Sequence, residues 1–264
     1  MGRRGGSIWL RLAVLLVILF LHVPFLIILL YAFNGDRGQA WPIVHWTTDW
    51  FGAAFGNPGL RDAVILSVQA AIGATIIAVV LGTLASFAVH RFRFFGRETI
   101  SFVLVLPLAL PGIVTGMALN ATINAGGFPF GLLTIIAGHA TFCVVVVYNN
   151  AIARLRRGSK SLDEASADLG ASPVQTFRYV TLPLLRGALF AGALLAFALS
   201  FDEVIVTTFT AGTQATLPIW ILDHLRLPNE RPIVNVVAVL IVVVMTVPIF
   251  IAQRLSGEEG AQVS

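Results

Sequence analysis

The sequence has 264 residues, of which 57% are hydrophobic and only 11% are charged. Globular domains contain about 25% charged residues, so this composition excludes an ordinary water-soluble domain. The formal net charge of +4 does not indicate nucleic-acid binding, because the basic residues lie between apolar stretches and form no single patch. The only cysteine, Cys143, excludes an internal disulfide framework and is expected to be a small buried residue.

Six apolar stretches approach or exceed the roughly 20 residues that span a bilayer. They cover residues 8–33, 60–89, 99–119, 128–152, 187–211 and 233–252. The first stretch is too long for the apolar core of a signal peptide, and no small-x-small cleavage site follows it, so we expect a retained anchor. The sequence therefore predicts an all-α integral membrane protein with six transmembrane helices.

The basic residues predict the orientation of these helices. If the N-terminus is inside, the inner segments hold Arg3, Arg4, Arg11, Arg91, Arg93, Arg97, Arg154, Arg156, Arg157, Lys160, Arg178, Arg186 and Arg254, and the outer ones Arg37, Arg61, Arg226 and Arg231. Such a bias favours cytoplasmic termini. We predict a cytoplasmic N-terminus (1–7), a single transmembrane domain (8–254) and a disordered cytoplasmic tail (255–264).

Two prolines interrupt the third apolar stretch. Pro107 and Pro111 are followed by Gly112 and Gly116. A proline removes a backbone donor, which membranes tolerate where a cavity or a neighbouring helix satisfies the freed carbonyl. The pattern predicts a kinked helix that lines a pathway, with a simple packing kink as the alternative.

The fourth apolar stretch contains an isolated histidine, His139. We expect a hydrogen-bonded structural residue, with a substrate contact as the alternative. No second histidine or cysteine stands at ligand spacing, so no metal site is predicted. At the other end of this stretch, Tyr148, Asn149 and Asn150 are expected to bond a neighbouring helix.

A polar segment separates the fourth and fifth apolar stretches. Ser161 and Glu164 have the spacing of a capping box, and Gly170 suits the left-handed position that ends a helix. Gln175 stands three residues after Ser172, which predicts a second box and a second short helix. Local chemistry leaves two interpretations open, a surface connector and a docking element for a soluble partner.

Asp202 and Glu203 are the only acids deep within an apolar stretch. An ionised carboxylate is costly there, so it normally faces a cavity or a partner. We expect a cation site or gate, or else a packing or salt-bridge role at a subunit interface. Adjacent helical positions diverge by about 100°, so the two acids are expected to differ in role.

The polar segment resembles a known signature. In the EAA signature of ABC importer permeases, E-A-A is followed after three residues by G and after nine more by I-x-L-P; here Ser166 and Val180 are the only departures. The resemblance implies a type I ABC importer permease fold, with residues 154–183 as the cytoplasmic coupling loop between helices 4 and 5. It implies ATPase-coupling roles for Glu164, Ala165, Ser166, Asp168, Leu169, Gly170, Leu182 and Pro183.

Further segments are similar to the spermidine/putrescine-type branch of that family. They are residues 106–119 (LPLALPGIVTGMAL), 138–143 (GHATFC) and 200–212 (SFDEVIVTTFTAG). The resemblance implies a polyamine such as spermidine or putrescine, or a related amine, as substrate. The candidates for its pathway are the residues singled out above, Asp202, Glu203, Pro107 and Pro111. Sulfate- and molybdate-type permeases resemble this region with a glycine-glutamate pair, which makes Glu203 the more architectural acid and Asp202 the better candidate for substrate preference.

The sequence contains no P-loop, serine elbow or zinc-protease motif, so no catalytic, cofactor or metal residues are predicted. The resemblance implies ATP and Mg²⁺ on two cytosolic ATP-binding subunits, a second related permease and an extracytoplasmic solute-binding protein. The chain itself would lie among the lipids of a bacterial inner membrane.

Three alternatives stay open. The same role could serve an aminophosphonate, an opine, ferric iron, thiamine or a small amino acid. An ion-coupled secondary transporter would explain six spans but not a capped polar segment. A membrane enzyme would need a reactive constellation that the sequence does not display.

Overall fold

A computed structural model describes residues 8–92, 94–158 and 160–261, without the side chains of Leu108, Lys160, Asp163 and residues 247–261. The predicted cytoplasmic residues 1–7 lie outside this part. Within it the backbone is helical, and the only β-pairing is an isolated bridge between Asn34 and Trp46. Where one domain was predicted, the chain divides into two compact units, Met1–Leu60 with Ile221–Ser264, and Arg61–Trp220.

The first unit pairs the two ends of the chain. It contains α1 (Ile8–Tyr31), α2 (Asp49–Phe55), a 3₁₀ turn (Pro228–Glu230) and α12 (Arg231–Ala261). α1 and α2 both pack against α12. Most apolar side chains of α1 are exposed, as expected of a surface that faces lipid. α12 extends to Ala261, so the backbone of residues 255–261 is helical in the segment where a disordered tail was predicted.

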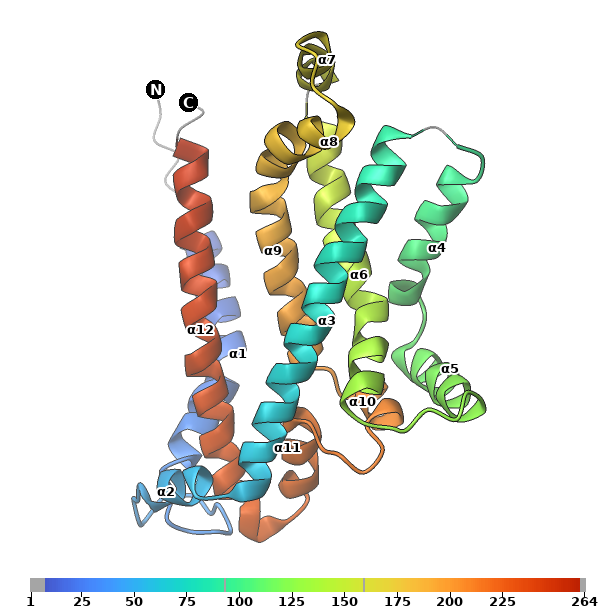
Figure 1. The fold of residues 1–264 in the computed structure, drawn as a ribbon. Helices are drawn as coiled ribbons and strands as arrows, with labels where there is room; N and C mark the ends of the chain where they lie inside the picture. Colours follow the sequence, from blue (N-terminus) through green and yellow to red (C-terminus); the bar gives the residue numbers. More distant parts are fainter. Residues whose placement is uncertain (1–7, 93, 159, 262–264) are drawn as a thin grey trace. The chain divides into compact units, whose positions relative to one another are not determined.

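The second unit holds the remaining elements (Figure 1). In chain order they are α3 (Pro58–Arg91, from Arg61), α4 (Arg97–Ala109), α5 (Gly112–Ala125), α6 (Leu132–Arg157), α7 (Lys160–Asp168), α8 (Pro173–Thr176), a π-helical turn (Phe177–Thr181), α9 (Leu182–Phe201), α10 (Ile205–Thr210) and the start of α11 (Leu217–Leu225). α6 and α9 pack against each other along their lengths, and α10 packs against α5 and α6.

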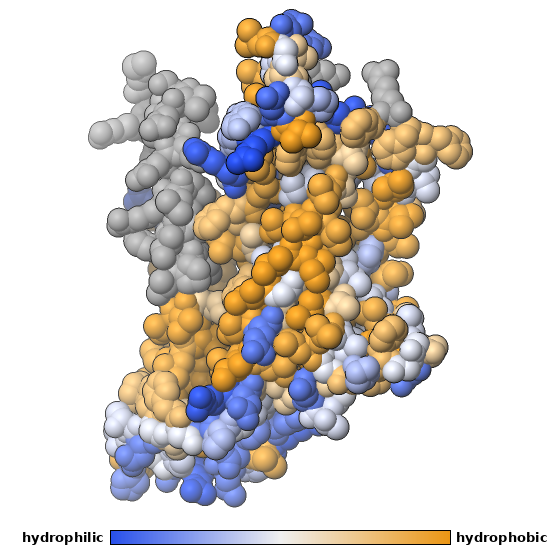
Figure 2. Space-filling model, in the orientation of Figure 1, coloured by the Kyte–Doolittle hydropathy of each residue, from blue (hydrophilic) through white to orange (hydrophobic). Residues whose placement is uncertain are grey.

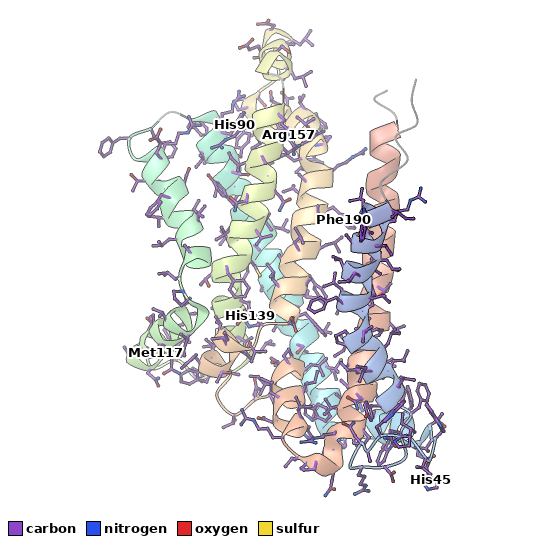
Figure 3. All side chains as sticks on the ribbon, turned by 180° about the vertical axis from the view of Figure 1, so that it is seen from behind. His45, His90, Met117, His139, Arg157 and Phe190 are labelled. Carbon is purple, nitrogen blue, oxygen red and sulfur yellow. The ribbon has the colours of Figure 1, made fainter. Side chains whose placement is uncertain are left out.

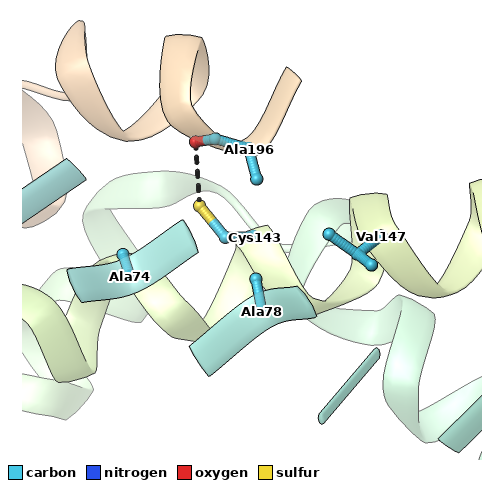
Figure 4. Close-up of a cluster of buried hydrophobic side chains, with 5 residues drawn as sticks. All are labelled: Ala74, Ala78, Cys143, Val147 and Ala196. Carbon is cyan, nitrogen blue, oxygen red and sulfur yellow. Dashed lines mark hydrogen bonds between the residues drawn. The ribbon is translucent and has the colours of Figure 1, made fainter. Parts of the chain in front are cut away.

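Small side chains bring α3, α6 and α9 close together. Ala74 and Ala78 of α3, Cys143 and Val147 of α6 and Ala196 of α9 form one buried cluster (Figure 4). Small residues at such interfaces let helices approach in a membrane, where apolar side chains gain nothing by leaving lipid. The Cys143 thiol donates to the Ala196 carbonyl oxygen at 3.3 Å, which confirms that it is a small core residue.

Among the described residues, five helices are long and apolar enough to cross a membrane, or six if α4 and α5 form one span, in agreement with the six predicted stretches. The face that contains α3 carries apolar side chains along the middle of the helix (Figure 2). Two predicted spans differ in detail. The third is bent by 99° between α4 and α5, and the fifth, predicted to run through residue 211, ends at Phe201.

Candidate functional site

The polar segment begins with α7 and a left-handed turn. Gly170 has a φ of +80°, the conformation that glycine adopts without strain. Its N–H donates to the Ala167 carbonyl at 2.9 Å, and the Ala171 N–H donates to the Ser166 carbonyl at 3.0 Å. These two bonds form a Schellman motif, which ends α7 where the sequence predicted. The predicted N-terminus is two residues off, because a cap at Ser161 would start the helix at residue 162, whereas α7 begins at Lys160 and places Ser161 in the first turn.

The second predicted cap forms as a reciprocal pair. The Gln175 N–H donates to Ser172 Oγ at 3.4 Å, and the Ser172 N–H donates to Gln175 Oε1 at 2.7 Å. Pro173 occupies the first helical position, where its missing N–H leaves no carbonyl without a partner. The hydroxyls of Ser166 and Thr176 lie 2.8 Å apart and join α7 to α8. The serine that departs from the EAA signature therefore makes a bond that alanine lacks.

The second short helix does not stand alone, contrary to the prediction. α8 continues through the π-helical turn into α9, so that Pro173–Phe201 is one uninterrupted helical run. The turn ends directly before Leu182 and Pro183. Proline has no N–H for the carbonyl four residues back, and its ring needs space there, which a locally widened helix provides. The L-P pair of the signature thus marks a change of helix type and not the start of a helix.

Two contacts fix this segment on the helices beside it. The ring of Phe177 lies edge-on to Phe87 of α3, with centroids 4.9 Å apart. Arg154 of α6 donates from Nε to the Leu184 carbonyl at 3.1 Å. Figure 1 shows α7 beyond the ends of α6 and α9, away from the helical core of this unit.

The tip of the segment exposes apolar side chains. Leu169 is 89% exposed and Val174 is 74% exposed, next to the exposed Ala165 and Glu164. In Figure 2 hydrophobic and hydrophilic atoms mix at this tip. Exposed leucine and valine on a well-capped scaffold offer a partner protein an apolar contact surface with charges beside it.

Pro111 separates α4 from α5. Leu110 before it has an extended backbone, with φ −80° and ψ 141°, because a proline disfavours the helical conformation of the preceding residue. Pro107 lies within α4, one turn before the break. The predicted interruption is therefore present, but it is a complete break with a sharp bend instead of a kink in one helix.

A second break separates α9 from α10, although residues 202–204 include no glycine or proline that would predict it. Asp202 caps the C-terminus of α9 and is exposed, whereas Glu203 is half-buried. Glu203 accepts the Val206 N–H on Oε1 at 2.9 Å, and its carbonyl accepts the Thr207 hydroxyl at 2.7 Å. The carboxylate of Asp202 has no hydrogen bond or ion pair to any described residue. The two acids therefore differ as expected, although both lie at a helix end and not deep within a span.

The two breaks lie side by side. A Cβ built on Gly112, directly after Pro111, would lie 3.7 Å from Ile205 Cβ at the start of α10. One turn further along α5, a Cβ on Gly116 would come within 2.5 Å of Phe209 Cδ2. Glycine is needed at position 116 because α10 approaches α5 this closely. The structure thus places Gly112, next to Pro111, against Ile205 at the start of α10, while Pro107 lies one helical turn before the α4–α5 break.

His139 joins this region to α6. Its side chain is 1% exposed and lies where α6 meets the end of α9 and the start of α10 (Figure 3). Nδ1 is 2.7 Å from Ser200 Oγ and Nε2 is 2.8 Å from Thr207 Oγ1. The expectation of a hydrogen-bonded structural residue is confirmed. Tyr148 likewise bonds a neighbouring helix, through Ser101 of α4 at 3.0 Å.

Sequence reasoning missed the residues that hold α10 in place. Asn120 of α5 donates to the Phe209 carbonyl at 2.7 Å, and Thr134 of α6 donates to the Thr210 carbonyl at 2.7 Å. Both bonds join residues more than 70 positions apart, so no local pattern reveals them. An exposed carboxylate, a helix C-terminus and a rigidly held short helix together provide a place where a cation is favoured.

Comparison with known proteins identifies relatives over nearly the whole chain. The family model described as "Binding-protein-dependent transport system inner membrane component" matches residues 78–257. A putrescine transport system permease protein of Escherichia coli K12 is 36% identical, covering 97% of this chain and 93% of that protein. A spermidine/putrescine transport system permease protein of Haemophilus influenzae is 32% identical, covering 91% and 93%.

Solved structures share the fold at low sequence identity. A chain of a bacterial ABC transporter that imports the acidic polysaccharide alginate superposes with a TM-score of 0.73 at 16% identity, covering 98% of each chain. A chain of the inward-facing MetNI methionine ABC transporter gives a TM-score of 0.60 at 18% identity, covering 75% of this chain and 92% of that one. These likenesses confirm the permease fold predicted from the signature.

Proposed function

The chain belongs to the family of binding-protein-dependent transport system inner membrane components, and from this premise we propose that it is the permease subunit of an ATP-driven importer of putrescine or a closely related polyamine. In this proposal a second permease completes the pathway, and two cytosolic subunits bind ATP and Mg²⁺. An extracytoplasmic binding protein delivers the solute. Hydrolysis of ATP belongs to the partner subunits.

The observation that carries the proposal is the capped tip formed by α7 and α8. It exposes Leu169 and Val174 on a scaffold that a Schellman turn and a capping box hold in one shape. A preformed apolar surface binds a partner without ordering cost. The signature residues Glu164, Ala165 and Gly170 lie on this tip, and Leu182 and Pro183 follow the π-helical turn at its base. We therefore assign the tip to ATPase docking.

The basic residues of the second unit support the orientation. The C-terminus of α3 with Arg91, the start of α4 with Arg97 and the end of α6 with Arg157 lie at the same end of this unit as α7 (Figures 1 and 3). Arginine favours the cytoplasmic side of a membrane span. The proposal places this end, and both termini, in the cytoplasm.

The substrate class rests on the relatives and on Asp202. The relatives named above are putrescine and spermidine/putrescine permeases. Asp202 presents an exposed carboxylate at the C-terminus of α9, where the aligned peptide dipoles also favour positive charge. Both effects favour the binding of a protonated amine and disfavour the binding of an anionic solute. Asp202 is therefore our candidate contact, whereas the Glu203 carboxylate accepts the Val206 N–H and serves the turn.

The test is uptake by the reconstituted complex. The chain is co-purified with its second permease and ATPase subunits and placed in proteoliposomes, with the binding protein and labelled putrescine outside and ATP inside. We expect uptake that requires both ATP and the binding protein. Omitting ATP, or supplying a non-hydrolysable analogue, is the matched control.

Other results would change the assignment in different ways. Uptake driven by an ion gradient without ATP would favour a secondary transporter. ATP-dependent uptake of an amino acid, an opine or an aminophosphonate in place of putrescine would support the assignment as an importer permease and contradict the assignment of a polyamine as its substrate.

A further inference from the structure

A buried side chain from another helix bonds to both sides of the break between α9 and α10. Ser200 lies two residues before Asp202, and Thr207 lies three residues after the break. Both hydroxyls bond to opposite nitrogens of His139, which α6 supplies. Ser200 and Thr207 are buried, with 2% and 0% exposure. His139 therefore contacts both sides of the break at once.

The bonding partners fix the direction of the hydrogen bonds. The Thr207 hydroxyl donates to the Glu203 carbonyl, so its single proton is used and its oxygen must accept from His139. Nε2 of His139 then carries the proton, and Nδ1 accepts from the Ser200 hydroxyl. One continuous chain of donors runs from Ser200 through His139 and Thr207 to the carbonyl beside Asp202.

Packing alone does not account for this arrangement. Ser200, His139 and Thr207 are polar, yet they lie beside a cluster of small and apolar side chains on α6 and α9. Replacing a buried polar network by apolar residues of similar shape costs little stability. What such a replacement removes is the directional constraint that these hydrogen bonds place on the ends of α9 and α10.

We propose that His139 is a positioning residue for transport, which holds α9 and α10 at the angle that places the Asp202 carboxylate in the solute pathway. The inference rests on the proposed function. The link to Thr207 is the decisive one, because Thr207 also fixes the backbone of Glu203. The hydrogen bond to Ser200 sets the orientation of the His139 imidazole ring.

The first experiment separates the two links. In His139→Gln the side-chain amide reaches the place of Nε2 and can still donate to Thr207, whereas in His139→Asn it reaches only the place of Nδ1. We expect His139→Gln to keep more than half of the ATP-dependent putrescine uptake rate and His139→Asn to lose at least tenfold. Equal losses in the two variants would overturn the proposal.

Two adjacent threonines provide the matched control. Thr207 and Thr208 each donate to the carbonyl four residues back, Glu203 and Val204, but only Thr207 bonds to His139. We expect Thr207→Val to lower uptake as much as His139→Asn, and Thr208→Val to lower it less than twofold. The double variant His139→Asn with Thr207→Val should be no worse than either single one. A similar loss in Thr208→Val would count against the link.

Epistasis with Asp202 distinguishes positioning from a merely structural role. If His139 acts through Asp202, then His139→Asn has no further effect on the uptake rate of an Asp202→Asn complex. A structural role would lower that rate again. If His139→Asn does not assemble, Thr207→Val takes its place in this comparison, since it removes a single hydroxyl.

Amide hydrogen exchange tests the geometry of the α9–α10 break independently of transport. In the purified complex we expect the amides of Val206 and Thr208 to exchange at least tenfold faster in His139→Asn and Thr207→Val than in wild type and in Thr208→Val. Unchanged exchange would overturn the proposal. If wild type takes up no putrescine but this exchange pattern appears, the proposed substrate fails while the structural link to His139 stands.

Discussion

The turn between α7 and α8 at the tip and the break between α9 and α10 both interrupt the helices, but they are stabilised over different distances along the chain. At the tip, the bonds that shape the turn join residues three to five positions apart, such as Ala171 with Ser166 and Gln175 with Ser172. At the break, His139 reaches Ser200 and Thr207 across 61 and 68 positions. The tip keeps its shape by itself, whereas the break depends on neighbouring helices.

The largest effect is expected from a change that breaks the local turn of the tip. Gly170→Val forces a β-branched residue into a positive φ, which costs about 2 kcal/mol or more. A Cβ at this position meets no atom within 4 Å, so the expected cost comes from backbone strain and not from a clash of the Cβ. We expect substrate-stimulated ATP hydrolysis and uptake to fall at least tenfold, while membrane insertion persists.

Gly170→Asn is the matched control, since asparagine tolerates the left-handed conformation better than other residues that carry a side chain. It should retain most of the uptake. If Gly170→Val transports as well as wild type, the docking geometry of the tip is wrong.

The next largest effect tests the exposed charge at the break. Asp202→Asn keeps the shape of the side chain and removes its charge, and a charge-assisted hydrogen bond is worth about 1.5–3 kcal/mol, or roughly 10- to 100-fold. We expect putrescine uptake to fall by about tenfold at saturating binding protein. Putrescine uptake should fall less in Asp202→Glu, which keeps the charge. Equal uptake by wild type and Asp202→Asn would remove the electrostatic argument.

A smaller effect probes the packing between the two breaks. Gly116→Ala places a methyl group 2.5 Å from Phe209 Cδ2, and such overpacking costs about 1–3 kcal/mol. Gly112→Ala, on the same helix, meets Ile205 at an ordinary 3.7 Å. We expect a lower thermal midpoint of the purified complex for Gly116→Ala and little change for Gly112→Ala. The same shift in both variants would mean that α10 is not held against α5 as described.

The smallest effect concerns the second cap of the tip. Ser172→Ala removes the N-cap acceptor of α8, at a cost of about 1 kcal/mol, whereas Ser172→Asp restores one. We expect faster hydrogen exchange at Gln175 in Ser172→Ala and near-normal exchange in Ser172→Asp. Uptake should change less than threefold, because the Schellman turn still ends α7. A larger loss of uptake would show that the two halves of the tip depend on each other.

The sequence predicted the tip well because its bonds are local. Gly170, Ser172 and Gln175 each act on residues within a few positions, and all three have the predicted roles. The start of α7 was misplaced by two residues, and α8 proved to be continuous with α9. That continuity depends on a π-helical turn, which has no distinctive composition.

The break at Asp202 was not predicted, for a physical reason. Residues 202–204 contain neither glycine nor proline, and the apolar stretch around them favours an unbroken helix. Within the break, the Glu203 carboxylate accepts the N–H of Val206, which is a local contact. The bonds of His139 to the two sides of the break form only after α6 has packed against α9 and α10. Pro111, whose effect on Leu110 is local, did predict the other break.

The uninterrupted run from Pro173 to Phe201 has a mechanical consequence. Its 29 residues form a helical run about 40 Å long, with the α7–α8 tip at one end and Asp202 directly after the other. Backbone hydrogen bonds connect the two ends, and the π-helical turn at Phe177–Thr181 is the one section of this run that is not α-helical. If the tip docks as proposed, a displacement of the tip would therefore move Asp202 without an intervening side-chain interface.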